Sequence, residues 1–289
     1  MEQIIPFILA FFGGVFGAAI GGVTSFILFG LLGFIGIGLI IGTGSDVFLN
    51  SVALSPIFAP HVAFAGGVAA AAYMGKLSRN GNLKTEVGEV AEEFNGANIF
   101  APINGTGNVG ALIVGGIFGV LGAIVLHLLD NVVFLLADNL AISVVTTNII
   151  ARLVFGDGEL MSALPKEVKK VDLITKDLLF NILWSFSLAI VMASMIEVIQ
   201  IPLFGFVLGA FVLVFIVAGV NVPMIHHVAL IGGMAMQVFG NIWLAGLFGV
   251  LAMLLCEAIG VTFNANAKSH IDPPAAAIVI ISLILLNFF

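Results

Sequence analysis

The chain has 289 residues, of which 61% are hydrophobic and 9% are charged, against roughly a quarter charged in ordinary soluble domains. With a mean hydropathy of +1.25, it carries more apolar surface than one soluble core can bury, so most of it is expected to lie in lipid. Nine Lys and Arg residues are too few for a phosphate-tracking surface, which argues against nucleic acid as a partner. The single cysteine excludes an internal disulfide framework.

Five apolar stretches are expected to form membrane helices in the first half of the chain. The N-terminus lacks the basic segment of a secretory signal, so the first stretch is expected to be retained. Ile4–Gly42 contains no charged residue and suits two tightly joined helices, because one crossing takes about 20 residues. His61–Gly75 follows two prolines, which predicts a broken or re-entrant entry. Asn108–Leu129 and Asp138–Phe155 complete the half.

Two polar segments interrupt the apolar pattern, and five further apolar stretches follow the second one. The segments Lys76–Ala101 and Asp157–Asp177 are expected to be solvated loops, each able to hold a short surface helix. The later stretches are Leu178–Val198, Pro202–Val220, His227–Gly240, Ile242–Ile259 and Pro274–Phe289. The sequence therefore predicts about ten crossings, some of them short enough to need bilayer thinning or re-entrant segments.

The basic residues predict an orientation. In a ten-span arrangement they all fall on one side: Lys76, Arg79, Lys84, Arg152, Lys166, Lys169, Lys170, Lys176 and Lys268. The positive-inside rule then places the main loops in the cytoplasm and both termini outside. We expect the membrane to be a prokaryotic cytoplasmic membrane.

Three sequence echoes in the same order indicate an internal repeat. The phrase His-Val-Ala-Phe-Ala-Gly-Gly begins at His61, and His-Val-Ala-Leu-Ile-Gly-Gly begins at His227, 166 positions later. Gly107-Asn108 likewise matches Gly240-Asn241, and Asp138 matches Asp272, each pair at the start of an apolar stretch. We therefore predict a first repeat at residues 1–156, with a cytoplasmic loop at 76–107. A linker at 157–177 and a second repeat at 178–289 follow.

Each predicted repeat has five spans, and an odd number of spans makes the second copy insert upside-down relative to the first. The predicted fold is therefore an all-α polytopic membrane protein with two five-span inverted repeats and broken or re-entrant helices. Such repeats are typical of secondary transporters, where they surround a central site. In plan this resembles the five-plus-five families such as the urea transporters and the sodium–proton antiporters, although the sequence carries no motif of either.

His61 and His227 are the candidate substrate-binding residues at the predicted broken helix starts, beside Pro60 and Pro223. Irregular backbone at membrane depth must line protein or water. A neutral imidazole there can both donate a hydrogen bond to a polar solute and accept one from it. The alternative is a helix-start histidine bonded to a carbonyl group. Asn108 and Asn241 are added as neutral hydrogen-bonding candidates.

Asp138 and Asp272 have two competing interpretations. Each immediately precedes an apolar stretch, and Asp272 is followed by two prolines, so each is expected to act as the N-cap of a helix. A coupling site for H⁺ or Na⁺ is the other interpretation. The spacing of Gly13-Gly14, Gly17 and Gly21-Gly22 predicts close helix packing instead of a pore lining.

The function expected from these features is a membrane transporter or channel for a small, neutral or weakly charged solute that passes between the two halves. No nucleophile–base set and no zinc spacing occurs in the sequence, so we expect neither an enzyme nor a cofactor. A membrane-embedded structural subunit of a larger complex is the alternative, and a lipid- or peptide-directed enzyme is a third. Expected partners are membrane lipid and the solute, and assembly into a homo-oligomer is left open.

Overall fold

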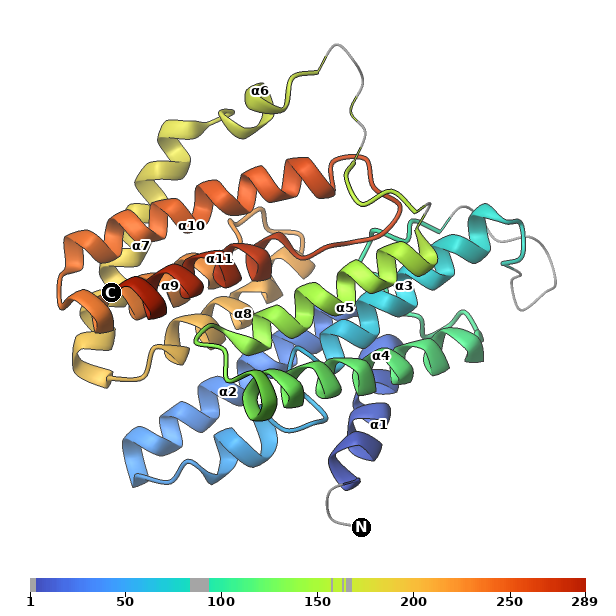
Figure 1. Ribbon diagram of the computed structural model, residues 1–289, viewed down its shortest axis with the longest axis horizontal. Coiled ribbons are helices and arrows are strands. Elements are labelled where there is room, and N and C mark those ends of the chain that lie inside the picture. Colours follow the sequence, from blue (N-terminus) through green and yellow to red (C-terminus); the bar gives the residue numbers. More distant parts are fainter. Residues whose placement is uncertain (1–3, 84–93, 157, 163, 165–167) are drawn as a thin grey trace.

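The structure is a computed structural model that describes residues 4–83, 94–156, 158–162, 164 and 168–289. Across these ranges every regular element is a helix, and most of the helices lie side by side (Figure 1). Eight charged residues of the predicted polar loops lie outside the described residues: Lys84, Glu86, Glu89, Glu92, Glu93, Asp157, Lys166 and Glu167.

The first half begins with two helices joined at one residue, as the sequence predicts. Gly21 separates them with φ 91°, a left-handed backbone conformation that favours glycine. The elements are α1 (Ile5–Ile20), α2 (Gly22–Thr43), η1 (Leu49–Ala53), α3 (Ala63–Arg79), α4 (Val109–Leu128), η2 (Leu129–Val133) and α5 (Asn139–Phe155). The irregular entry expected before α3 is present as η1 and the turns that follow it.

The second half contains a short helix and five longer ones. These are α6 (Lys170–Ile174), α7 (Leu178–Ile199), α8 (Leu203–Val217), α9 (His226–Phe239), α10 (Ile242–Phe263) and α11 (Pro273–Phe288). The short helix α6 lies in the polar linker, which confirms that this segment holds a surface helix.

Four helical segments are long and apolar enough to cross a membrane. They are α2, α7, α10 and the continuous segment Val109–Val133 formed by α4 and η2. Helices α1, α5, α8 and α11 are apolar but shorter. Large apolar side chains such as Phe12, Leu183 and Leu247 are exposed on these helices. An all-helical protein with this surface associates with a membrane.

Glycines bring the helices of the first half into close contact. Helix α1 packs against α3 and α4. A Cβ atom added to Gly14 would lie 2.2 Å from the carbonyl oxygen of Gly115, and one added to Gly66 would lie 2.6 Å from that of Gly14. The close packing predicted for the glycines of α1 is therefore confirmed.

The packing of the second half follows the same plan. Helix α7 packs against α9 and α10, as α1 packs against α3 and α4, and α9 contacts α11 as α3 contacts α5. Ala189 of α7 takes the place of Gly14, because it lies against both Gly232 of α9 and Gly249 of α10. Figure 1 shows α9 flanked by α11 and α8 in the same body as α3 and α5.

The two halves meet mainly through two pairs of helices, α2 with α8 and α5 with α11. The backbone N–H of Asp138 donates to Ser282 Oγ at 3.0 Å, and the N–H of Asp272 donates to Asn148 Oδ1 at 3.0 Å. Asn148 is the tenth residue after Asp138, and Ser282 is the tenth after Asp272. Helices α5 and α11 therefore run antiparallel, with the start of each beside the middle of the other.

Candidate functional site

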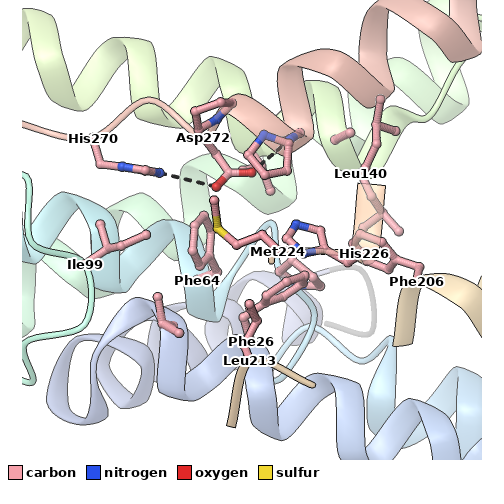
Figure 2. A pocket seen from close by; sticks show the side chains of 18 of the residues that line it. Phe26, Phe64, Ile99, Leu140, Phe206, Leu213, Met224, His226, His270 and Asp272 are labelled. Atoms are coloured by element: carbon pink, nitrogen blue, oxygen red, sulfur yellow. Dashed lines mark hydrogen bonds and ion pairs between the residues drawn. The ribbon is translucent and has the colours of Figure 1, made fainter. Parts of the chain in front are cut away.

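A cavity of about 330 Å³ lies where the two halves meet. We call it the central cavity. Its walls come from α2, α8, α5 and α11, and from the loops that precede α9 and α11. The register of the Asp138 and Asp272 echo matches three pairs of lining residues, Asp138 with Asp272, Ala141 with Ala275, and Val144 with Ile278. The helices that come second in each half, α2 and α8, add Val23, Phe26, Leu203 and Phe206. Figure 2 shows part of this lining from close by.

Asp138 and Asp272 cap the two antiparallel helices. Asp138 Oδ1 accepts the N–H of Ala141 at 2.8 Å, and Asp272 Oδ2 accepts the N–H of Ala275 at 2.9 Å. The capping role expected for both residues is therefore confirmed. Because Asp138 lies beside Ser282, ten helical residues from Asp272, the two caps are about 15 Å apart along the helix axis. They mark two ends of the central cavity.

The Asp272 end contains two histidines. His270 Nε2 lies 3.3 Å from Asp272 Oδ1. His226 is 4% exposed, and its Nδ1 has no hydrogen-bond partner among the described residues. Its ring lies 5.0 Å from that of Phe26. Figure 2 shows Asp272, His226, Phe26 and Phe64 around the same space, with the Met224 side chain among them.

The two histidines that lead the repeated phrase do not share a cavity. His61 lies on a second cavity, of about 530 Å³, together with His127, Asp130 and Asn131. His227 is 2% exposed, and neither of its ring nitrogens has a partner in the part of the chain that the structure describes. Their role in substrate binding stays a prediction, and the geometry brings Asp138 and Asp272 to the central cavity instead.

Asn108 and Asn241 begin α4 and α10, where their side chains act as caps. Asn108 Oδ1 accepts the N–H of Ala111 at 2.9 Å, and Asn241 Oδ1 accepts that of Trp243 at 2.9 Å. Neither residue lines the central cavity. Their proposed contact with a solute stays a prediction.

Sequence reasoning did not single out His226 or His270 for the site. Both stand next to selected positions, since His226 precedes His227 and His270 lies two residues before Asp272. Neighbouring side chains on a helix point about 100° apart, so adjacency alone could not say that His226 faces the cavity and His227 does not. Within the described residues no group of three His, Cys, Asp or Glu side chains is arranged to hold a metal ion.

Arg152 fixes the loop that carries His270 and Asp272. Its guanidinium is 2% exposed and donates to Leu160 O at 2.9 Å, to Asn264 Oδ1 at 2.9 Å and to Ser269 Oγ at 3.1 Å. It also donates to two further carbonyl oxygens, those of Phe263 and Ser269. Since α5 thereby holds the segment between α10 and α11, the Asp272 end of the cavity is anchored to both halves.

The chain belongs to the family DUF7973, described as a family of unknown function, and the match covers residues 1–168 and 185–287. The match therefore includes both helices that present the cavity carboxylates. No curated protein and no solved structure matches the chain.

Proposed function

We propose that this member of the DUF7973 family is a membrane transporter or channel for a small, neutral or weakly charged solute. The observation that carries the proposal is the central cavity, which residues at matching positions of the two halves line in pairs. A volume of about 330 Å³ lies at the lower end of the range of small-molecule sites, which is about 300–1,000 Å³. It would hold about ten waters at roughly 30 Å³ each.

The proposal includes two inverted repeats of five spans each. Support comes from the antiparallel course of α5 and α11 and from their reciprocal hydrogen bonds to Ser282 and Asn148. Helices α2 and α8 also run antiparallel, because Gly30 lies against Phe211 whereas Phe34 lies against Phe204. Matching helices that pair in opposite directions are what a twofold axis in the membrane plane requires. Such an axis would pass through the central cavity.

The proposal also places all ten longer helices across the membrane, with the basic loops in the cytoplasm and both termini outside. Helices α1, α5, α8 and α11 would cross with local thinning of the bilayer. Helices α3 and α9 lie among the others and are buried along most of their length, so lipid contact does not limit their length. The positive-inside distribution of the nine basic residues supports this orientation.

A structural subunit of a larger complex is the alternative, and it would need the glycine faces for partners. In α1 these faces are already covered by the chain itself. A Cβ atom on Gly17 would lie 1.9 Å from the carbonyl oxygen of Ala63. This favours the transporter, and stable co-purification with a soluble subunit would favour the alternative.

Flux into liposomes tests the proposal. The purified chain is reconstituted and screened with labelled small solutes, with and without a proton or sodium gradient. Val144 lines the cavity and is 4% exposed, so Val144→Phe should narrow the cavity and reduce flux at least tenfold. Leu153→Phe is the matched control on α5, because Leu153 is 53% exposed. Flux that neither variant changes, or no flux of any solute, would contradict the proposal.

A further inference from the structure

The central cavity carries acidic groups at both ends, and at the Asp272 end His270 Nε2 lies 3.3 Å from the carboxylate. Among the described residues that line it, Asp138 and Asp272 are the acids, and Lys and Arg are absent. A helix N-terminus contributes about half a positive charge, which offsets only part of each carboxylate. Each cap uses one carboxylate oxygen for its helix, and a carboxylate has about four lone-pair sites. Each carboxylate therefore retains acceptor capacity beyond its capping hydrogen bond, and Asp272 shares its own with His270.

The wall between the two ends is apolar and aromatic. The ring of Phe26 lies 5.4 Å from that of Phe206 and 5.8 Å from that of Phe64. A hard metal cation needs a shell of oxygen ligands. Besides the two carboxylates, Asn264 is the one described lining residue with a side-chain oxygen, and that oxygen already accepts from Arg152 and Ile271. Aromatic faces attract organic cations, so the lining suits an organic cation better than a metal ion.

His226 supplies a buried ring nitrogen without a partner beside Asp272. His226 is 4% exposed, and its Nδ1 has no hydrogen-bond partner among the described residues. In a neutral imidazole one ring nitrogen accepts a hydrogen bond, and a buried polar atom without a partner is costly. An N–H group of a ligand in the cavity would satisfy this atom. Figure 2 shows His226 and Asp272 facing the same space.

We propose that the Asp272 end of the central cavity binds a small organic monocation, with an ammonium group between the Asp272 carboxylate and His226 Nδ1. The apolar body of the ligand packs against Phe26 and Phe206. Asp138, about 15 Å away along the helix axis, provides a second carboxylate at the other end of the cavity. The inference rests on the proposed function and names the class of its solute.

The cavity reaches the surface of the protein, so a ligand has access to it. Phe100 and Met224 belong to the lining, and 41% and 44% of their respective surfaces are exposed. Methionine side chains adapt readily to a ligand because they are flexible. Figure 2 shows the Met224 side chain beside His226 and Asp272.

Three probes of similar size separate the contribution of charge from that of apolar contact. Labelled pentylammonium is bound to the full chain in detergent at pH 8, where an alkylammonium, like a Lys side chain, stays charged. Pentanol and pentanoate are added as the neutral and the anionic competitor. We expect saturable binding of pentylammonium, with both competitors at least tenfold weaker than unlabelled pentylammonium.

Variants that keep the helix cap identify the site. Asn caps a helix as well as Asp does, so Asp272→Asn should fold normally and weaken pentylammonium binding at least tenfold. His226→Leu should weaken it about threefold to tenfold, and Asp138→Asn less than threefold. Asp46→Asn is the control, because Asp46 is exposed and lies outside the cavity. It removes the same charge and should leave the affinity unchanged.

Three results would overturn the inference: no saturable binding, pentanol competing as well as pentylammonium, or wild-type affinity in Asp272→Asn. Failure of this inference can be told apart from failure of the proposed transport function. Saturable binding of pentylammonium without flux of any solute contradicts the transporter alone. Flux of neutral solutes that pentylammonium does not inhibit contradicts the organic-cation site alone.

Discussion

The two ends of the central cavity share a backbone plan but differ in chemistry. At one end Asp138 caps α5, and at the other Asp272 caps α11 with the same hydrogen bond to the third residue of the helix. Only the Asp272 end adds histidines. His226 lies on the cavity where the first repeat has Pro60, and His270 contacts Asp272 where the first repeat has the exposed Leu136. The same backbone plan can thus hold a carboxylate alone at one end and a carboxylate with two histidines at the other.

This difference shows how two matching halves can form a cavity whose ends differ in chemistry. The caps and the helix pairs set where the cavity lies, and they are the same in both halves. Side chains that do not cap a helix, such as His226, can differ between the halves. The experiments below compare matching positions of the two halves, from the largest expected effect to the smallest.

Arg152 has no counterpart in the second half, where Leu286 occupies the matching position and is 41% exposed. Replacing Arg152 with Met removes donors to three backbone carbonyls and two side chains. A buried polar group left unpaired costs about 1–3 kcal/mol, so we expect Arg152→Met to lower the free energy of unfolding by about 3 kcal/mol or more. Leu286→Met should change it by less than about 0.5 kcal/mol. Unfolding in mixed detergent micelles measures both, and equal effects would contradict the anchoring role.

Gly66 and Gly232 occupy matching positions of the repeated phrase but have different space around them. A Cβ atom on Gly66 would lie 2.6 Å from the backbone oxygen of Gly14, whereas one on Gly232 would lie 3.0 Å from Cα of Ala189. Overpacking costs about 1–3 kcal/mol, so Gly66→Ala should be destabilising by about 2–3 kcal/mol and Gly232→Ala by about 1 kcal/mol or less.

The control for this pair is Gly38→Ala, since no atom lies within 4 Å of a Cβ atom at that position. Alanine in a helix interior is favoured over glycine by about 0.5–1 kcal/mol, so Gly38→Ala should be neutral or stabilising. The same micelle unfolding assay applies. If Gly232→Ala proved the more damaging change, the packing described for the two halves would be wrong.

Asn148 and Ser282 accept reciprocal hydrogen bonds from the two Asp residues. Ser282→Ala and Asn148→Ala should each cost about 1 kcal/mol, the usual net value of one hydrogen bond. Asn148→Ser places a hydroxyl acceptor in the first half, as Ser282 does in the second. It should change the free energy of unfolding by about 0.5 kcal/mol or less. Asn148 Nδ2 has no partner among the described residues, so its removal costs little. A loss with Asn148→Ser as large as with Asn148→Ala would show that the two positions are not equivalent.

The sequence anticipates the helices and their caps well, and the site less completely. Helix positions follow from long apolar runs, and Asp138 and Asp272 are recognisable as caps because each stands just before such a run. The repeated phrase predicts that His61 and His227 bind substrate at matching positions, but their side chains lie in different surroundings. Which face of α9 meets the cavity depends on how α2, α8 and α11 pack around it, and no local pattern contains that information.

Arg152 illustrates the same limit. The sequence places it near the cytoplasmic end of a span, as one of the nine basic residues that predict the orientation. The structure buries it because the end of α10 and the loop before α11 fold over α5 and offer carbonyl oxygens. Contacts between segments so far apart in the chain become visible only when the helices are placed together.

The central claim is that matching helices of the two halves cross the membrane in opposite directions. Thr43 and Ala218 lie at the ends of the matching helices α2 and α8, and both are exposed. In a Cys256→Ser background, single cysteines introduced as Thr43→Cys and Ala218→Cys are labelled in intact cells with a membrane-impermeant maleimide. The account predicts that Thr43→Cys is labelled from outside and that Ala218→Cys is labelled only after the membrane is opened. Labelling of both positions from the same side would contradict it.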